Sequence, residues 1–198
     1  ATGAQAAVEH SVRETERRLV ALASRGDRGA FGNLYERYVN PIYRYISYKL
    51  EQREDVEDLT SRTFLGAWAS ISDGAWSERP FGPWLFRIAH NLIVDFYRAR
   101  RATVPLDDAA RQVEHTYRQD RASPERMADA ALTATRVRQA LGRLTEDQQE
   151  VVVLRFFEGL SAAEVAAIIG KREGAVRALQ FRALSVLADL LHQQRACA

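Results

Sequence analysis

Cysteine, methionine and long apolar runs are scarce in this chain of 198 residues. The single cysteine is Cys197, which excludes a disulfide framework and a cysteine-rich zinc site. No stretch approaches the roughly 18 apolar residues that a membrane-spanning helix needs, and no signal-peptide pattern opens the chain. We therefore expect a soluble, cytoplasmic protein that does not insert directly into a membrane.

Recognisable catalytic patterns are missing too. No glycine-rich phosphate loop follows a strand, and no pair of carboxylates falls in a familiar catalytic frame. The histidines are scattered without the spacing of metal ligands, at His10, His90, His115 and His192. The sequence predicts a protein that is not an enzyme and has no metal, no cofactor and no small-molecule substrate.

Net charge is also small, at +2, but the charges are segregated along the chain. Residues 51–58 hold five acidic side chains and one arginine, whereas residues 171–182 hold four basic side chains and one acidic one. Only two of the 28 basic residues are lysines, so arginine supplies nearly all of the positive charge. These two stretches are therefore candidates for contacts with different partners.

Hydrophobic periodicity is helical throughout the first half, and no run alternates like a strand. We expect a helix over about 14–24 that ends at Gly26, and a helical stripe from residue 31 that Pro41 interrupts. A helix over 56–68, a loop over 70–83 and a helix over 84–101 should follow. The expected core positions are Phe31, Leu34, Tyr35, Tyr38, Ile42, Tyr45, Ile46, Val56, Leu59, Thr63, Phe64, Leu85, Ile88, Leu92 and Phe96.

The chain changes character after this first half. Residues 103–128 lack sustained periodicity and hold two prolines, so they are interpreted as a flexible linker between two small helical domains, with residues 1–13 as a disordered N-terminal segment. The fold class is therefore all-α, with one domain over 14–102 and a second over 129–198.

Helix signals in the second domain are strong. Thr145 with Gln148, and Ser161 with Glu164, have capping-box spacing, and Gly170 is placed to end the helix that begins after Ser161. A last helix over about 172–191 should bury Val176, Leu179, Ala183, Leu187 and Leu190. A short capped helix, a tight turn and a longer helix form a helix-turn-helix pattern, which is typical of DNA-binding proteins.

The outer face of that last helix would enter a DNA groove. Small Ala178 would allow close approach, and Arg182 could reach a base edge or a phosphate. The other residues of this face are Lys171, Arg172, Glu173, Arg177 and Phe181. The alternative is a plain helical hairpin with a solvated basic face.

A second candidate face lies on the helix over 84–101. Aromatic, guanidinium and amide groups alternate on it, which suits single-stranded nucleic acid. The residues are Trp84, Arg87, Asn91, Asp95, Arg98, Arg100 and Arg101. The alternative is that Trp84 covers the core and the polar groups are only hydrated. The acidic stretch 51–58 likewise has two interpretations, a basic protein partner or favourable acid at a helix N-terminus.

Three stretches together resemble a bacterial sigma factor of the extracytoplasmic-function class (group four). AFGNLYERYVNPIYRYI with EDVEDLTSRTFLGAW resembles family regions 2.1 and 2.2, and FGPWLFRIAHNLIVDFYRARR resembles regions 2.3 and 2.4. LTEDQQEVVVLRFFEGLSAAEVAAIIGKREGAVRALQFRAL resembles region 4, and its ending is similar to the actinobacterial, developmental type. The resemblance implies a region 2 helical bundle and a region 4 helix-turn-helix.

The resemblance also implies a function. Such a chain binds core RNA polymerase, recognises the −10 and −35 promoter elements and promotes melting, and an anti-sigma factor controls it and can hold it at the membrane. Polymerase contacts map to Asp58, Leu59, Thr60, Arg62, Thr63 and Phe64. The face from Trp84 to Arg101 maps to the −10 element, and the loop over 70–83 to the capture of a flipped base. The face from Lys171 to Arg182, with Arg155 on the preceding helix, maps to the −35 element.

Two other functions remain open from the residues alone. A stand-alone helix-turn-helix regulator would leave the acidic stretch and the Trp84 face without a role, and an interaction adaptor would leave the basic face unexplained. The chain also departs from the family where Ser61 and Arg62 replace the usual glutamine and acid.

Overall fold

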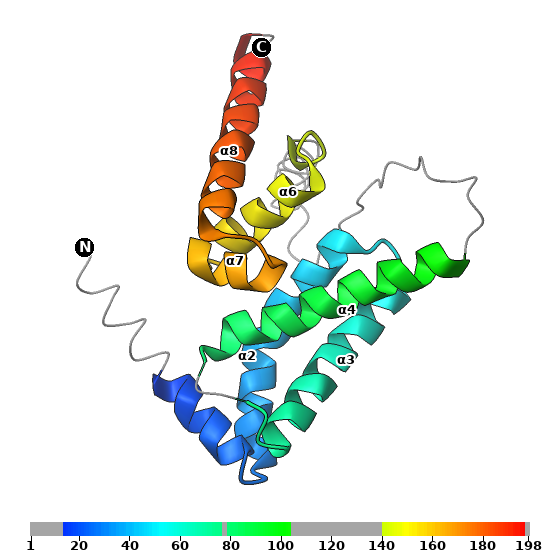
Figure 1. Ribbon diagram of the computed structural model, residues 1–198, viewed down its shortest axis with the longest axis vertical. Helices are drawn as coiled ribbons and strands as arrows, with labels where there is room; N and C mark the ends of the chain where they lie inside the picture. Colours follow the sequence, from blue (N-terminus) through cyan, green and yellow to red (C-terminus); the bar gives the residue numbers. More distant parts are fainter. Residues whose placement is uncertain (1–13, 77–78, 104–139, 197–198) are drawn as a thin grey trace, which may run out of the picture. The chain divides into compact units, whose positions relative to one another are not determined.

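The computed structural model describes residues 14–76, 79–103 and 140–196, and all regular structure in these ranges is helical (Figure 1). This confirms the all-α class. The chain divides into two compact units, Ala1–Gln112 and Val113–Ala198. The expected N-terminal segment 1–13 and nearly all of the expected linker lie outside the described residues, so the domain boundaries stay predictions.

The described part of unit 1 is built from four helices. A helix over 14–23 is followed by α2 (Arg28–Lys49), α3 (Arg53–Ser72) and α4 (Phe81–Thr103). The first helix ends in a turn whose Gly26 has φ of 91°, a conformation that glycine adopts without steric cost. The Asp27 side chain then accepts a hydrogen bond from the Ala30 amide at 3.0 Å and caps α2.

Proline 41 does not interrupt α2, contrary to the sequence expectation. A proline inside a helix removes one backbone hydrogen bond and costs ~3 kcal/mol. The residues that follow it, Ile42, Tyr45 and Ile46, are fully buried, and each large apolar side chain gains ~1.5–3 kcal/mol on burial. Burial on the C-terminal half of α2 therefore outweighs the local cost of Pro41.

Helix α3 packs one face against α2 and α4. Its buried residues are Val56, Leu59, Thr60, Thr63, Phe64, Ala67 and Ile71. The two threonine hydroxyls donate to backbone carbonyls one turn earlier at 2.7 Å, so neither buried hydroxyl is unsatisfied. Edge-on ring contacts join Tyr35 to Phe64 and Phe31 to Trp68 at centroid distances of 4.7 and 4.9 Å.

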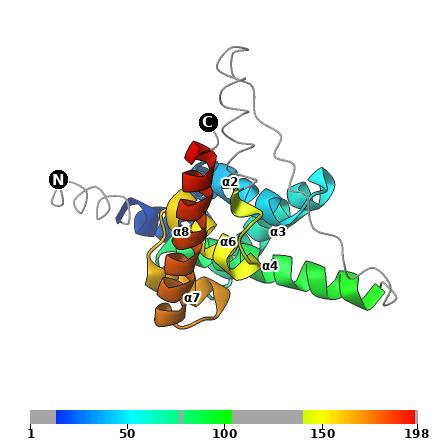
Figure 2. The same ribbon diagram turned by 90° about the horizontal axis from the view of Figure 1, so that it is seen from above.

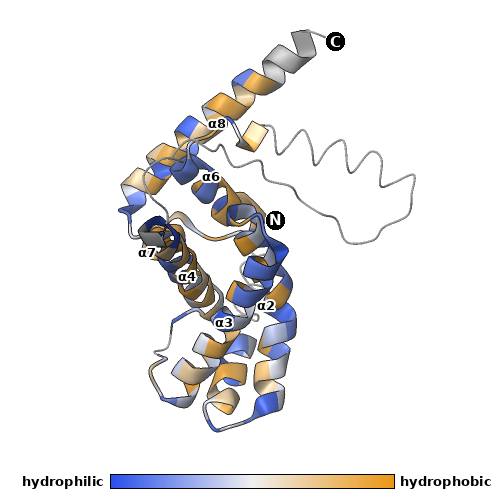
Figure 3. Ribbon diagram, turned by 90° about the vertical axis from the view of Figure 1, so that its right-hand side faces the viewer, coloured by the Kyte–Doolittle hydropathy of each residue, from blue (hydrophilic) through white to orange (hydrophobic). Residues whose placement is uncertain are grey.

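Helix α4 begins three residues before the expected Trp84, and α3 continues to Ser72, so the intervening loop is shorter than expected. Its core face is also rotated relative to the expected one. Leu85 is buried, but Ile88, Leu92 and Phe96 are only half-buried. The buried residues are Phe81, Leu85, Phe86, Ala89 and Ile93. Buried residues therefore recur every fourth position along α4, where it packs against α2 and α3, and these positions differ from the predicted ones. Figure 3 shows hydrophobic and hydrophilic residues alternating along these helices.

Unit 2 contains α6 (Glu146–Val152), a π-helical segment η1 (Val153–Phe157), α7 (Ala162–Ile169) and α8 (Glu173–Ala196). Both predicted capping boxes are confirmed. The Thr145 hydroxyl accepts from the Gln148 amide at 3.4 Å, and the Ser161 hydroxyl accepts from the Glu164 amide at 3.2 Å. Gly170, with φ of 68°, ends α7 as expected.

The core of unit 2 forms where α8 meets α6 and α7. Val151, Leu154, Val165, Val176 and Ala183 are almost completely inaccessible to solvent. Leu179 is buried as expected, whereas Leu187 and Leu190 are only half-buried because the C-terminal half of α8 extends beyond α6 and α7 (Figure 1). None of the described helices in either unit is long and apolar enough to cross a membrane.

We predict that Gly82→Ala destabilises unit 1. A Cβ atom at Gly82 would lie 2.7 Å from the Tyr38 Oη, whose ring packs edge-on against Phe81. The tyrosine must move, which should lower the free energy of unfolding by about 1–3 kcal/mol. Equilibrium urea unfolding measures this loss. Gly32→Ala is the matched control, because Gly32 is helical and nothing lies within 4 Å of its Cβ position. The control should be neutral or stabilising, and equal midpoints for Gly82→Ala and wild type would contradict the close approach.

Candidate functional site

Four of the six residues assigned to polymerase contact lie inside unit 1. The side chains of Leu59, Thr60, Thr63 and Phe64 are at most 6% exposed. They hold α3 against its neighbours, so they belong to the core and do not form a surface on which a partner could dock. Only Asp58 and Arg62 of that set reach solvent.

The exposed face of α3 includes a residue that sequence reasoning missed. Leu65 is 66% exposed. It follows Asp58 by seven positions and Arg62 by three, so all three share one helical face together with exposed Ser61. That spacing was readable in the sequence, but Leu65 was not singled out there. We call Asp58, Ser61, Arg62 and Leu65 the α3 stripe.

Charges near the N-terminus of α3 are partly neutralised within the helix. Arg62 Nη1 lies 3.4 Å from Asp58 Oδ2, and Arg53 Nε donates to Glu57 Oε1 at 2.6 Å. The hydrogen bond and charge of Glu57 raise the pKa of Arg53 above its ordinary value. Glu54 and Asp55 lie in the first turn, where the helix dipole favours acid. The unusual Arg62 thus pairs with Asp58 on the same face.

The polar face of α4 is largely open to solvent. Its exposed residues are Arg87, Asn91, Asp95, Arg98, Arg100 and Arg101. Trp84 is half-buried and its ring lies 5.7 Å from that of Phe81, so it partly covers the core. Arg98 Nη1 is 3.0 Å from Asp95 Oδ1, which orients that guanidinium. The last turns of α4 project beyond the other helices of unit 1, as both views show (Figure 1, Figure 2).

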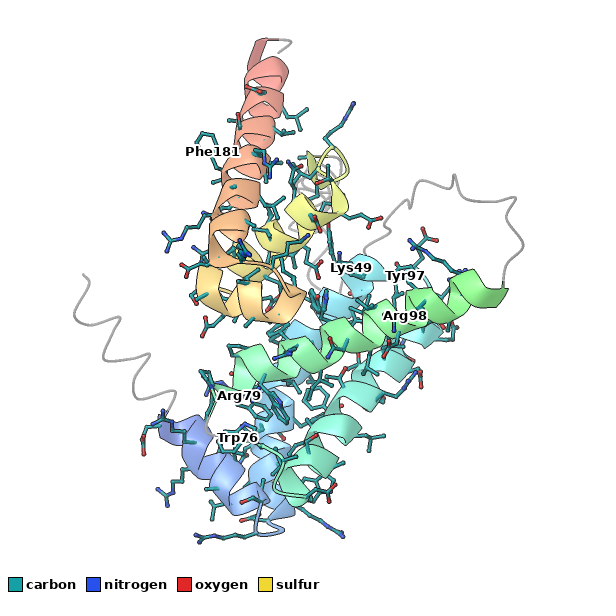
Figure 4. All side chains as sticks on the ribbon, viewed as in Figure 1. Lys49, Trp76, Arg79, Tyr97, Arg98 and Phe181 are labelled. Atoms are coloured by element: carbon teal, nitrogen blue, oxygen red, sulfur yellow. The ribbon has the colours of Figure 1, made fainter. Side chains whose placement is uncertain are left out.

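The outer face of α8 is exposed at every residue that the sequence assigned to it. It comprises Lys171, Arg172, Glu173, Arg177, Ala178, Phe181 and Arg182, the first two from the turn before the helix. Phe181 is 76% exposed and projects from the helix (Figure 4). Arg177 Nε donates to Glu173 Oε1 at 3.1 Å, and Arg182 Nε donates to the Ala178 carbonyl at 3.3 Å. An apolar centre flanked by guanidinium groups can meet both bases and phosphates.

Two predicted DNA contacts are engaged within unit 2. Lys171 Nζ lies 2.8 Å from Asp147 Oδ2 and so ties the turn before α8 to the start of α6. Arg155 is half-buried, and it donates to Gln180 Oε1 at 3.0 Å and to the Leu160 carbonyl. Its guanidinium therefore joins η1 to α8 and to Leu160, the residue before the N-cap of α7. Phe156 and Phe157, also on η1, are more than half exposed and were not singled out from the sequence.

In the part of the chain that the structure describes, no three His, Cys, Asp or Glu side chains lie where they could hold a metal ion. His90 instead makes a structural contact, since its Nδ1 lies 3.2 Å from the hydroxyl of the buried Tyr45.

We predict that Arg155→Ala destabilises unit 2 by about 1.5–3 kcal/mol, because it removes charge-assisted hydrogen bonds to partly buried acceptors. Urea unfolding followed by circular dichroism measures the loss. Arg182→Ala serves as the comparison, since exposed Arg182 bonds only within its own helix and should change stability by less than about 0.5 kcal/mol. Equal, small effects of both substitutions would show that Arg155 has no structural role.

Comparisons with known proteins match both units. Residues 34–103 match the family model described as Sigma-70 region 2, and residues 134–187 match Sigma-70, region 4. The first match spans most of α2 and all of α3 and α4. The second includes α6 and α7 and reaches into α8.

Three curated relatives illustrate the similarity. The ECF RNA polymerase sigma factor BldN of Streptomyces coelicolor is 41% identical over 87% of this chain, which spans only 64% of BldN. RNA polymerase sigma factor CnrH of Cupriavidus metallidurans is 34% identical, with 90% of this chain and 95% of CnrH aligned. The ECF RNA polymerase sigma-E factor of Haemophilus influenzae is 31% identical, with 88% and 94% aligned.

A solved structure agrees with the sequence relatives. The structure of CnrH in complex with the cytosolic domain of CnrY has a TM-score of 0.65 and 32% identity, covering 90% of this chain and 98% of that one. The two helical units match two sigma regions in the same order, and CnrH and the sigma-E factor align over nearly their whole length. The chain therefore belongs to the sigma-70 family of RNA polymerase sigma factors, in its extracytoplasmic-function (ECF) class.

Proposed function

We propose that this chain binds core RNA polymerase, recognises −10 and −35 promoter elements and promotes DNA melting, acting in the cytoplasm as an initiation factor and not as an enzyme. The observation that carries the proposal is the separation of three exposed faces, on α3, α4 and α8, within a chain whose units match sigma regions 2 and 4. Each face has the chemistry that one of these tasks requires.

The α8 face is assigned to duplex DNA at the −35 element. Arg172, Arg177 and Arg182 supply cations for phosphates and base edges, and exposed Phe181 with Ala178 supplies apolar contact for a thymine methyl group. Glu173 holds Arg177 through a hydrogen bond, which reduces the entropy lost when Arg177 binds. Lys171 and Arg155 act mainly by fixing the turn and the helix, because both already have partners inside unit 2.

The α4 face is assigned to the −10 element in its single-stranded form. Guanidinium groups at Arg87, Arg98, Arg100 and Arg101 would follow the phosphates, and Asn91 would meet base edges. Trp84 offers only part of its ring, because it also packs on Phe81. Unpaired bases gain these contacts only in the open state, so binding shifts the equilibrium toward melted DNA.

The α3 stripe is assigned to core polymerase. Leu65 supplies an exposed apolar anchor, and Asp58 and Arg62 supply charges of opposite sign beside it. An apolar centre with a polar rim is the usual arrangement of a protein interface. The mutual pairing of Asp58 and Arg62 lowers the net charge of the stripe, so we expect apolar contact at Leu65 to contribute more than the acidic stretch does.

Promoter binding should require polymerase because each unit reads one short element. When both units are held on polymerase, binding of the second element becomes intramolecular and gains effective concentration. We propose that the first domain extends over 14–102 and the second over 129–198, and that residues 103–128 link them.

We further propose control by an anti-sigma factor that covers these faces and can hold the chain at the membrane. Support comes from CnrH, which was solved with the cytosolic domain of CnrY. The rival function, a stand-alone helix-turn-helix regulator, would bind DNA without polymerase and would leave the α3 stripe without a role.

Sigma-free core polymerase provides the direct test. Core enzyme with this chain should give promoter-specific run-off transcripts from a promoter library, whereas core alone should not. Specific DNA binding by the chain alone, with no transcription when core is added, would favour the stand-alone regulator.

We predict that Asp58→Arg weakens binding to core polymerase, because it destroys the pair with Arg62 and places two like charges beside Leu65. The apparent Kd should rise at least fivefold in a core pull-down titration, as is usual for the loss of about 1 kcal/mol. Glu36→Arg, the same charge reversal on the exposed surface of α2, is the control and should bind normally. Unchanged affinity of Asp58→Arg would remove the α3 stripe from the interface.

We also predict that Arg182→Ala lowers promoter affinity by about 1–3 kcal/mol while core binding stays intact, since Arg182 lies on the exposed α8 face. Filter binding of the assembled holoenzyme to promoter DNA measures this loss. Arg143→Ala removes an exposed arginine of unit 2 that is not part of α8, and it should have little effect. If Arg182→Ala abolished core binding instead, α8 would be a polymerase-binding helix.

A further inference from the structure

The helix over 14–23 meets the start of α4 at a residue to which the proposed function gives no role. Glu16 and Phe81 line the same small recess, so the two helices are neighbours there. Glu16 is only 5% exposed, although it carries a carboxylate. It also precedes residues 34–103, which match the sigma region 2 family model, so the match assigns nothing to it.

Two side chains of α2 hold this carboxylate. The Tyr38 hydroxyl donates to Glu16 Oε1 at 2.6 Å, and Arg37 Nε lies 3.5 Å from the same oxygen. The Arg37 guanidinium also lies 5.9 Å from the centre of the Tyr38 ring. Burial of a charged group is costly, and a buried ion pair is often no more stabilising than apolar side chains of the same size. What the carboxylate adds is direction, because its hydrogen bond fixes one orientation of the tyrosine ring.

The tyrosine in turn contacts the first turn of α4. Its ring packs edge-on against Phe81 at a centroid distance of 5.4 Å. Its hydroxyl end lies against the backbone at Gly82, where a Cβ atom would be 2.7 Å from Tyr38 Oη. The Phe81 ring lies 5.7 Å from that of Trp84, the first residue of the α4 face. One hydrogen bond and two ring contacts therefore connect Glu16 to that face.

We propose that Glu16 is a positioning residue for strand opening. Through Tyr38 it fixes the first turn of α4, which presents Trp84 to the melted −10 strand. The inference rests on the proposed function, which assigns the α4 face to single-stranded DNA. Groups that are held in place before the strand arrives lose less entropy on binding, so more of their binding energy is left to shift the equilibrium toward the open state. The first helix therefore acts in melting although Glu16 itself is buried.

Holoenzyme assembled from core polymerase and the full chain tests this role on a promoter that the wild-type holoenzyme opens. Glu16→Ala and Tyr38→Phe each remove the hydrogen bond between the two side chains. Both should slow the appearance of permanganate-reactive thymines about tenfold, as is usual for the loss of a hydrogen bond to a charged group. Affinity for core polymerase and for duplex that carries the −35 element should stay unchanged.

Three further variants show whether the hydrogen bond is the cause. Glu16→Gln keeps an oxygen that accepts from Tyr38, so it should open the promoter nearly as fast as wild type. Glu14→Ala shortens an exposed acid on the same helix, and Tyr35→Phe removes an exposed hydroxyl from α2. These two are the matched controls, and neither should slow opening.

A promoter whose −10 region is premelted by mismatches separates positioning from folding. At saturating template, Glu16→Ala and Tyr38→Phe should transcribe it at the wild-type level, because the duplex no longer has to be opened. Loss of transcription on this template as well would overturn the proposal, since the contact would then only hold unit 1 together.

Two other results would also overturn it. One is a wild-type rate of opening by either Glu16→Ala or Tyr38→Phe. The other is a Glu16→Gln holoenzyme that opens as slowly as Glu16→Ala, because the hydrogen bond to Tyr38 would then not be the cause. If the wild-type holoenzyme opened no promoter at all, the proposed function would have failed instead.

Discussion

Burial of one face of α3 between α2 and α4 is the interaction on which unit 1 depends. It fixes Leu59, Thr63 and Phe64 in the core, and it thereby decides that Asp58, Arg62 and Leu65 face outward. The same packing outweighs the cost of Pro41 in α2 and sets which residues of α4 are buried. The surfaces proposed for polymerase and for the melted strand are therefore the faces that core packing leaves free, and this explains why they lie on different helices.

Helix boundaries with local chemical signals were the most predictable part of the structure. The capping boxes at Thr145 and Ser161 and the left-handed Gly170 each depend on a few neighbouring residues, so spacing alone predicted them correctly. The basic face of α8 was equally predictable, because an amphipathic helix whose inner face is well packed must expose its outer face. The family resemblance added that the two units serve one function, which hydrophobic periodicity could not show.

Features that depend on tertiary packing were not predictable. The path of α2 through Pro41 and the rotated core face of α4 follow from contacts between helices distant in sequence. Arg155 looked like a free cation until its bonds to Gln180 and Leu160 were seen. Glu16 gave no signal in the sequence, since a single acid in an amphipathic helix resembles any solvated side chain. In the structure it is only 5% exposed and accepts a hydrogen bond from the Tyr38 hydroxyl at 2.6 Å. The role of a charged residue such as Arg155 or Glu16 becomes visible only from the buried groups that it contacts, because its residue type alone does not show it.

The DNA-reading faces of the chain should act only when polymerase holds them. Strand opening is the most direct measure of this dependence. Permanganate reactivity of thymines near the start site should be measured on promoter duplex with core enzyme alone, with the chain alone and with both. Reactive, unpaired thymines should appear only when both are present. Reactivity with the chain alone, or duplex that stays protected with both on a template that they bind, would contradict it.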